Sequence, residues 1–154
     1  MTHSNSTLVA EATGPKGTTQ LNLPVSTLIS QAKGPGGEAL YLNADNFGNV
    51  TVQYARQPTS QWYTLFNPGN RGLMFINVAS GLALTVNQDN HSLSMTDPST
   101  PTDHNTWTLG GTAIRPFYND DLNLNVRGNS YPAGTQVIVY KWDNDPNSKW
   151  DFGK

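Results

Sequence analysis

The chain has 154 residues, of which 36% are hydrophobic and 13% are charged, and its formal net charge is −2 at pH 7. A chain of this length is most simply one domain with a substantial core, burying about two thirds of its unfolded surface. The nine basic residues are scattered singly, which argues against a nucleic acid or an anionic membrane as partner, because both require clustered Lys and Arg. Cysteine is absent, so disulfides and Cys-based zinc sites are excluded.

Hydropathy bears on location. The first thirty residues contain no apolar run that resembles a signal peptide, and nowhere are there enough consecutive apolar residues to cross a bilayer. We therefore expect a cytoplasmic protein with no membrane insertion, unless it is exported by a non-classical route. With so few charges, its surface must present mainly Asn, Ser, Thr, Gln and Gly to water. Such a surface suits a neutral polyhydroxyl ligand, but it would also serve only to keep the protein soluble.

Residues 1–24 are predicted to form an N-terminal extension with one extra hairpin. The segment TLVAEATGPKG (7–17) closely matches TLISQAKGPGG (27–37), and both are typical of a strand that enters a Gly-Pro turn. An alternating strand with Leu21 and Leu23 follows the first copy. Two roles are open for this hairpin: a flap that covers the rest of the domain, or an exposed strand edge that pairs two subunits into a homodimer.

Residues 25–154 are predicted to form a second region of twelve short strands separated by turns rich in Asn, Asp, Gly and Pro. No segment shows a convincing amphipathic helical pattern. The strands fall into three units of four, at about 25–66, 67–110 and 111–154. They are expected at 27–32, 39–44, 50–55, 62–66, 73–78, 82–86, 92–95, 106–109, 112–118, 122–126, 136–142 and 149–152.

Three tryptophans mark the repeat. Trp62, Trp107 and Trp150 recur about every 44 residues, and each follows a polar turn and opens an alternating strand. A period near forty also fits propeller blades or a solenoid, but three blades are too few for a propeller. We therefore predict an all-β fold, a β-trefoil with pseudo-threefold symmetry, in which the three tryptophans are buried at equivalent positions.

The unit endings resemble a known lectin motif. Gln61-Trp62, Asn105-Thr106-Trp107 and Ser148-Lys149-Trp150 resemble degenerate forms of the Gln-x-Trp motif that closes each repeat of the ricin-B-type lectins. The likeness runs from about Leu28 to Lys154 and is strongest in QVIVYKWDNDPNSKW (136–150), which has the layout of a galactose-binding repeat. Residues 113–150 are also similar to Euonymus-type plant lectins, and INVASGLALTV (76–86) is similar to the cysteine-free agglutinins of filamentous fungi.

This resemblance implies a non-catalytic carbohydrate-binding lectin, such as a defence-related agglutinin, whose partners are glycans with a galactose-type (galactose or GalNAc) or other N-acetylated hexose. It also implies roles for residues of the third unit. The roles are a hydrogen-bond acceptor at Asn125, a wall at Ile138, a stacking ring at Tyr140, and hydrogen-bonding loop residues at Asn147 and Ser148. Trp142 lies outside the threefold pattern, and it either flanks the sugar or packs on the surface. Two residues depart from the family pattern, since Asn125 replaces an aspartate and Ser148 replaces a glutamine.

The other two units match the pattern less well. In the first unit, Asn43 and Tyr54 align with the acceptor and the stacking ring, which makes them a possible second site. In the second unit Thr85 replaces the acceptor and Met95 or Thr96 replaces the ring. We expect no site of this type there, despite His104 and Asn105.

No pattern indicates catalysis, a metal site or a cofactor. The three histidines have no partners at metal-ligand spacing, and the sequence lacks a phosphate-binding loop and a nucleophile elbow. Asp143 and Asp145 are expected to cap backbone amides in a turn and not to serve as a glycosidase pair. The alternative to a lectin is a β-trefoil protein-interaction module such as a protease inhibitor, for which Arg56-Gln57-Pro58-Thr59 is the candidate loop.

Overall fold

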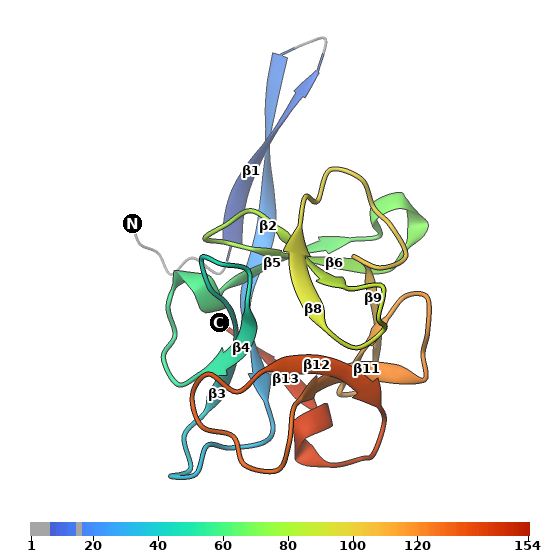
Figure 1. Ribbon diagram of the computed structural model, residues 1–154. Helices are drawn as coiled ribbons and strands as arrows, with labels where there is room; N and C mark the ends of the chain where they lie inside the picture. Colours follow the sequence, from blue (N-terminus) through green and yellow to red (C-terminus); the bar gives the residue numbers. More distant parts are fainter. Residues whose placement is uncertain (1–6, 15–16) are drawn as a thin grey trace.

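The computed structural model describes residues 7–14 and 17–154, which form an all-β protein (Figure 1). Within these residues the helical segments are three 3-10 turns, η1 (Pro58–Ser60), η2 (Pro68–Asn70) and η3 (Pro146–Ser148), and none could span a membrane. The strands are β1 (Thr7–Gly14), β2 (Gly17–Ser30), β3 (Leu40–Ala44), β4 (Val50–Gln53), β5 (Trp62–Phe66), β6 (Leu73–Asn77), β7 (Ala83–Val86), β8 (Leu93–Thr96), β9 (Trp107–Gly110), β10 (Ala113–Pro116), β11 (Leu122–Val126), β12 (Val137–Lys141) and β13 (Trp150–Gly153).

The strand pairing gives the predicted β-trefoil. Strands β2, β5, β6, β9 and β10 pair in that order, β13 pairs with β2, and every pair is antiparallel. The backbone N–H of Trp150 donates to the carbonyl of Thr112 at 2.9 Å, which joins β13 to the start of β10 and closes a six-stranded barrel. The remaining strands form three hairpins, β3–β4, β7–β8 and β11–β12. Backbone hydrogen bonds from Val52 to Thr135 and from Val139 to His91 link neighbouring hairpins into one cap.

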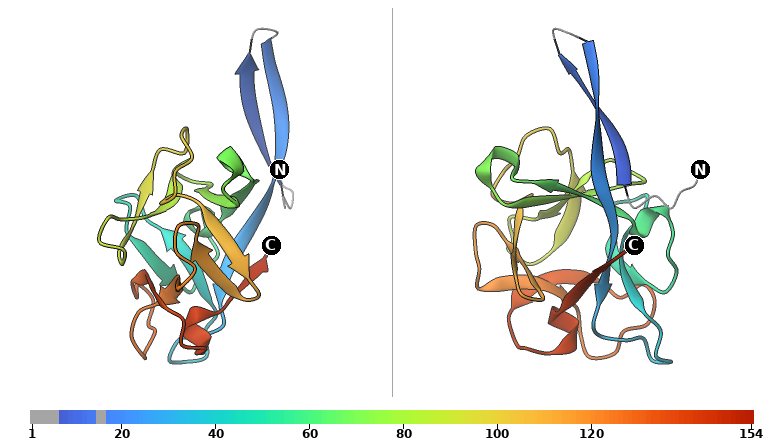
Figure 2. Two further views of the ribbon diagram at one scale, coloured as in Figure 1. Left: turned by 90° about the vertical axis from the view of Figure 1, so that its right-hand side faces the viewer. Right: turned by 180° about the vertical axis from the view of Figure 1, so that it is seen from behind.

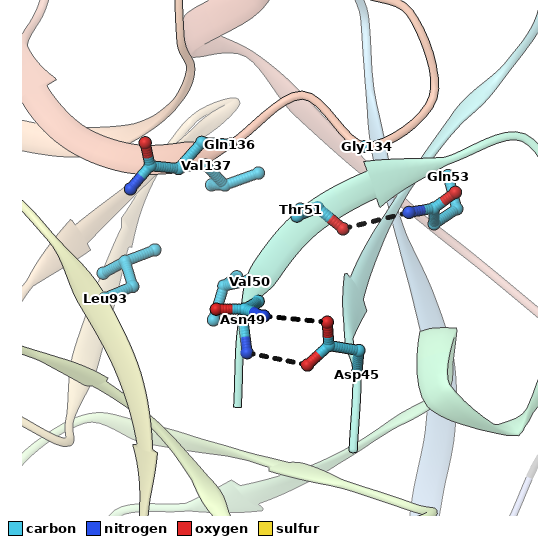
Figure 3. Close-up of a pocket in the computed structure, with 9 residues that line it drawn as sticks. All are labelled: Asp45, Asn49, Val50, Thr51, Gln53, Leu93, Gly134, Gln136 and Val137. Atoms are coloured by element: carbon cyan, nitrogen blue, oxygen red, sulfur yellow. Dashed lines mark hydrogen bonds between the residues drawn. The ribbon is translucent and has the colours of Figure 1, made fainter. Parts of the chain in front are cut away.

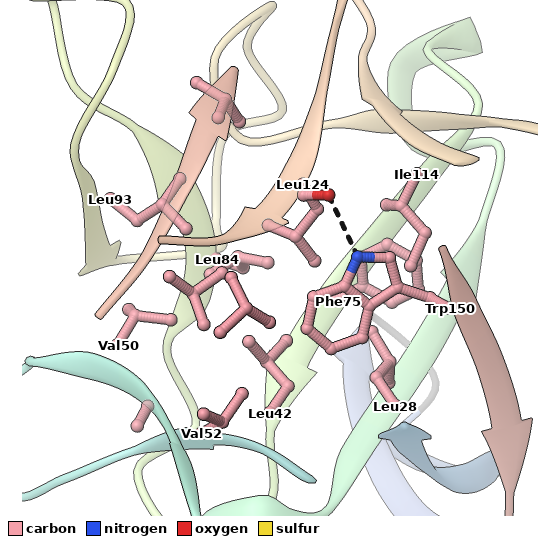
Figure 4. Close-up of a cluster of buried hydrophobic side chains, with 14 of the residues drawn as sticks. Leu28, Leu42, Val50, Val52, Phe75, Leu84, Leu93, Ile114, Leu124 and Trp150 are labelled. Atoms are coloured by element: carbon pink, nitrogen blue, oxygen red, sulfur yellow. Dashed lines mark hydrogen bonds between the residues drawn. The ribbon is translucent and has the colours of Figure 1, made fainter. Parts of the chain in front are cut away.

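The three tryptophans are buried at equivalent positions, as predicted. Each indole N–H donates to the carbonyl of a leucine in the first strand of its own hairpin: Trp62 to Leu42 at 3.0 Å, Trp107 to Leu84 at 3.1 Å, and Trp150 to Leu124 at 3.0 Å. Figure 4 shows the last of these bonds amid the buried leucine, valine and phenylalanine side chains of the core. A buried indole N–H needs such an acceptor, so each tryptophan joins barrel to cap in the same way.

All twelve predicted strands exist, with ends that differ by a few residues, but the first is only the end of a longer strand. β2 begins at Gly17 and runs without a break to Ser30. Its partner changes at Pro24, which is the last residue paired with β1, while Val25 pairs with Tyr63 of β5. Proline lacks the N–H that a central ladder requires, so it is tolerated where a strand exchanges one neighbour for another.

The predicted N-terminal hairpin is present as a two-stranded ribbon, here called the arm, made of β1 and residues 17–24 of β2. Figures 1 and 2 show that the arm extends away from the barrel in every view. The expectation of a covering flap is therefore wrong. The residues 15 and 16 of the expected Gly-Pro turn lie outside the described part of the chain.

Candidate functional site

The third unit contains a cavity of about 280 Å³ between the β11–β12 hairpin and the loop that carries η3. Four of the six residues predicted for a sugar site lie together in its wall: Asn125, Ile138, Tyr140 and Asn147. The remaining lining residues are His91, Arg127, Gly128 and Asp143.

Strand register brings three of these side chains to one surface. Asn125 of β11 pairs directly with Ile138 of β12, and cross-strand partners share a face of the sheet. Tyr140 follows Ile138 by two residues and so lies on the same face. The side chain of Asn125 is buried, with 3% exposed, whereas 45% of Tyr140 is exposed at the end of β12. The cavity therefore has an amide at its base and an aromatic ring at its rim.

Asn147 is supplied by the 3-10 turn η3 and is held firmly. Its Nδ2 donates to Oδ1 of Asn125 at 3.2 Å and to the carbonyl of Val126 at 2.9 Å, with the carbonyl of Gly128 at 3.5 Å. Three oxygens around one atom fix that atom as the amide nitrogen, because only the nitrogen carries protons to donate.

This arrangement leaves two buried polar atoms without a protein partner. They are Nδ2 of Asn125, a donor, and Oδ1 of Asn147, an acceptor. Buried polar groups are rarely left unpaired, since each lost hydrogen bond costs about 1–3 kcal/mol. A hydroxyl group can accept from the first and donate to the second, so a hydroxyl that entered this position would satisfy both atoms.

Charged residues at this cavity were not predicted from the sequence. The guanidinium of Arg127 donates to Oε1 of Gln136 at 3.0 Å, and Oδ1 of Asp143 accepts from the backbone N–H of Asp145 at 3.0 Å. Asp143 thus caps a backbone amide, as expected. Arg127 could have been found by continuing the strand two residues beyond Asn125, since alternate residues share a face.

His91 had no comparable signal in the sequence. It belongs to the β7–β8 turn of the second unit and reaches the cavity because its carbonyl accepts the N–H of Val139 at 2.9 Å. A residue from a neighbouring repeat enters the site only through the docking of hairpins, which local sequence does not encode.

Two predicted site residues do not line the cavity. Ser148 is fully buried, and its Oγ donates to the carbonyl of Asp145 at 2.8 Å. It therefore closes the η3 turn, and direct sugar contact by this residue is ruled out by its burial. Trp142 is partly exposed just beyond β12 but is not among the lining residues.

In the first unit the predicted alignment of Tyr54 is wrong by one residue. Tyr41 pairs with Gln53, as Asn123 pairs with Tyr140, so Gln53 occupies the position of the stacking ring. Tyr54 instead packs partly buried against the core, with its ring beside Gly34.

The acceptor of Asn43 is also occupied. Its Oδ1 accepts from Oγ1 of Thr59 at 2.7 Å and lies 3.4 Å from Nε2 of Gln57. The polar loop of the first unit thus satisfies the amide that would face a ligand. Asn43 and Tyr54 do not form a second copy of the third-unit arrangement.

A polar cavity of about 470 Å³ lies at the first-unit position instead, where the three hairpins of the cap meet (Figure 3). Val50, Leu93 and Val137, one from each unit, lie around it. Asp45 is held there by Asn49, whose backbone N–H and Nδ2 donate to its carboxylate at 2.9 and 3.1 Å, and these bonds lower the pKa of Asp45. This cavity is larger than that of the third unit, but its lining contains no aromatic ring.

The second unit fills its corresponding position with its own side chains. Oγ1 of Thr85 lies 2.6 Å from Oγ1 of Thr96, which is the residue at the position of Tyr140. His104 stands three residues before its tryptophan, as Asn147 does, and its ring stacks on Tyr118 with centroids 4.3 Å apart. These contacts leave no free donor or acceptor pair of the kind seen at Asn125 and Asn147.

The candidate inhibitor loop exposes Arg56, Gln57 and Pro58 and is anchored at Thr59. Pro58 and Thr59 lie in the 3-10 turn η1, and the carbonyl of Thr59 accepts from Nδ2 of Asn77 at 2.9 Å. Together with the bond from Thr59 to Asn43, this ties the loop to the barrel.

The turn that carries His91 is held by one carboxylate, which makes it sensitive to acid. Asp89 accepts from the N–H of His91 at 3.0 Å and from the N–H and Oγ of Ser92 at 2.9 and 2.7 Å. The bonds from Ser92, followed by that from His91, lower the pKa of Asp89. The stabilisation is therefore complete above the ordinary aspartate pKa of about 4 and is lost as pH falls through the lower folded-state pKa.

We expect Asp89→Asn to lose less stability than the parent between pH 5 and pH 2, because asparagine does not titrate. Thermal unfolding at a series of pH values measures this difference. Parallel curves for the two proteins would contradict it, and Asp120→Asn, at an exposed turn, serves as the control.

Comparison with known proteins places the fold. No protein-family model and no curated protein matches the sequence. Solved structures do match. The agglutinin of Rhizoctonia solani is 20% identical, with a TM-score of 0.65 over 87% of this chain and 96% of that one.

A ricin B-like lectin of Macrolepiota procera, in complex with lactose, is 15% identical, with a TM-score of 0.65 over 88% of this chain and 99% of that one. The C-half of an earthworm R-type lectin, in complex with GalNAc, is 15% identical, with a TM-score of 0.64 over 84% and 97%. The fold is the β-trefoil that these lectins share. At these identities the similarity establishes the β-trefoil architecture, and the chemistry of this chain has to be argued from its own cavity.

Proposed function

We propose that this protein is a non-catalytic lectin whose sugar site is the third-unit cavity. The observation that carries the proposal is the pair of buried, unpartnered amide atoms of Asn125 and Asn147 beneath the exposed ring of Tyr140. A protein that needed this region only for stability would gain by pairing these atoms, as the first unit does with Asn43 and Thr59.

A pyranose supplies what the cavity lacks. One ring hydroxyl would accept from Nδ2 of Asn125 and donate to Oδ1 of Asn147, while a patch of sugar C–H groups lies against the face of Tyr140. Ile138 would limit the sugar from the side, and Arg127 and Asp143 at the rim offer a donor and an acceptor to further hydroxyls. The combination of one stacking face and fixed polar contacts is what a site selective for one hexose requires.

The sugar class is inferred from the matching lectins together with this geometry. The structures from Macrolepiota procera and earthworm contain lactose and GalNAc, and lactose ends in galactose. We infer a galactose-type or N-acetylated hexose at the ends of glycans, recognised without chemical change. A protein assembly with several sugar sites could agglutinate cells. We infer a defence-related role for such an agglutinin.

A glycan array combined with a protease panel tests the proposal most directly. The parent protein is expected to retain glycans that end in galactose or GalNAc and to leave serine and cysteine proteases active. Binding to no glycan together with stoichiometric inhibition of a protease would overturn the lectin and support the interaction module.

A further inference from the structure

A second surface of the molecule is apolar, unlike the sugar cavity, which is lined by polar and charged residues. Phe66, Leu73, Leu109 and Phe152 line a shallow groove of about 190 Å³ whose edge is Pro24, at the root of the arm. The exposed fractions of Phe66 and Leu109 are 64% and 50%. The other lining residues are Ser26 and Thr64, so the groove carries no charge. A contiguous exposed apolar patch can mark a contact surface.

The arm beside this groove has apolar residues at paired positions of its two strands. Its register pairs Leu8 with Leu23 and Ala10 with Leu21, which places these alternate positions on one face of the ribbon. Within the described residues β1 pairs with β2 alone, and a lone two-stranded ribbon is marginally stable in water. Its eight-residue strands extend about 26 Å, and Figures 1 and 2 show them leading away from the barrel that bears the groove.

We propose that the groove is the docking site for the arm of a second copy of this chain. Groove and arm are continuous through Pro24, which lines the first and ends the second. A twofold axis beside this residue would let each arm cover the partner's groove, which is the reciprocal arrangement that a closed dimer requires. Glu11 is the one charged residue among the groove lining and residues 7–14 and 17–24, so the contact would be driven by burial of apolar surface.

The geometry also explains why the arm does not fold back on its own barrel. Strand β2 passes straight from the arm into the barrel, pairing first with β1 and then with β5 and β13. A strand continuous over fourteen residues cannot reverse onto the groove at its own root. Only another copy can present its arm there.

Sedimentation of the full chain over a dilution series tests the proposal. We expect a mass near 34 kDa, twice the 16.8 kDa of one chain, and a shift to the monomer for the double variant Phe66→Ser/Leu109→Ser. Phe47→Ser is the matched control, because Phe47 is 90% exposed and does not line the groove; it should remain dimeric. Circular dichroism and thermal unfolding verify that each variant is folded.

Arm variants identify the occupant. Leu21→Asp, on the apolar face, should dissociate the dimer, whereas Asn22→Asp, one residue along and on the opposite face, should not. A parent that stays monomeric overturns the proposal. So does a dimer that survives the groove variant, or one that ignores Leu21→Asp. Flotation of a monomeric parent with phosphatidylcholine vesicles, lost in the groove variant, would reassign the groove to a lipid surface.

Failure of this proposal is distinguishable from failure of the sugar site. Calorimetry with lactose measures the third-unit cavity of each chain and should be equal in parent and groove variant. Agglutination depends on two linked sites and should fall about a hundredfold or more when the dimer dissociates. Equal agglutination by parent and monomeric variant would contradict the dimer's role, and absent lactose binding would contradict the cavity alone.

Discussion

Replacing Trp107 by alanine is expected to lower the free energy of unfolding by about 3–5 kcal/mol, a large share of the roughly 5–15 kcal/mol that a domain possesses. The indole is fully buried and packs against Phe75 with ring centroids 6.5 Å apart. Its removal leaves a cavity between the barrel and the cap. It also leaves the carbonyl of Leu84, which accepts the indole N–H at 3.1 Å, without a hydrogen-bond donor. Urea unfolding followed by circular dichroism measures the loss.

Two further substitutions separate packing from the hydrogen bond. Trp107→Phe keeps most of the aromatic volume but also loses the indole N–H, so its own loss should be about 1–3 kcal/mol, the cost of one unpaired buried carbonyl, and smaller than that of the alanine variant. Trp142→Ala is the control for tryptophan as such, because its side chain is partly exposed. If Trp142→Ala were as destabilising as Trp107→Ala, burial at the threefold position would not be the cause.

The fold could be predicted from the sequence because its signals repeat. The tryptophans Trp62, Trp107 and Trp150 each perform the same two tasks, filling the junction of barrel and cap and donating to a leucine carbonyl. Alternating strands between polar turns supplied the rest. In each of the three units, the local strand and turn pattern agrees with the threefold symmetry of the whole domain. Such agreement between local and global signals makes a sequence specify one fold.

The site was predicted in part, and the errors have physical causes. Asn125, Ile138 and Tyr140 were predicted from the resemblance of the third unit to a galactose-binding repeat, and strand alternation in the structure places them on one face. Tyr54 was misplaced because it is the aromatic residue nearest the expected position, whereas the strand pairing places Gln53 there, and one residue moves a side chain to the other face. Sequence shows an aromatic residue near the expected position, whereas only the pairing register shows on which face it lies.

The course of the arm was beyond prediction from the sequence for a different reason. Its hairpin could be inferred from the match between residues 7–17 and 27–37, but a flap and a projecting ribbon have the same local pattern. The continuity of β2 through Pro24 decides between them, since it fixes the direction of the arm by the strand it prolongs.

The sugar site carries the functional proposal, and Tyr140→Ala is expected to weaken lactose or GalNAc binding by about 1–2 kcal/mol, roughly five- to thirtyfold. The ring is almost half exposed at the rim and makes no hydrogen bond to the protein in the described residues, so its removal should leave stability nearly unchanged. Isothermal titration calorimetry, with urea unfolding as the companion measurement, distinguishes a lost contact from a damaged fold.

Asn125→Asp tests the same site by removing the donor of the proposed contact. Oδ1 would still accept from Nδ2 of Asn147, which lies 3.2 Å from the asparagine oxygen, but the unpartnered Nδ2 is replaced by a charged oxygen. A sugar hydroxyl has one proton, so it could donate to this oxygen or to Oδ1 of Asn147, but not to both. We therefore expect weaker binding of a galactose-type sugar, by about the 1–3 kcal/mol that one unpaired buried polar group costs. Trp142→Ala should bind as the parent does, because that ring does not line the cavity. A Tyr140→Ala variant that binds as well as the parent, with Trp142→Ala weakened instead, would move the sugar out of this cavity and onto the loop beyond β12.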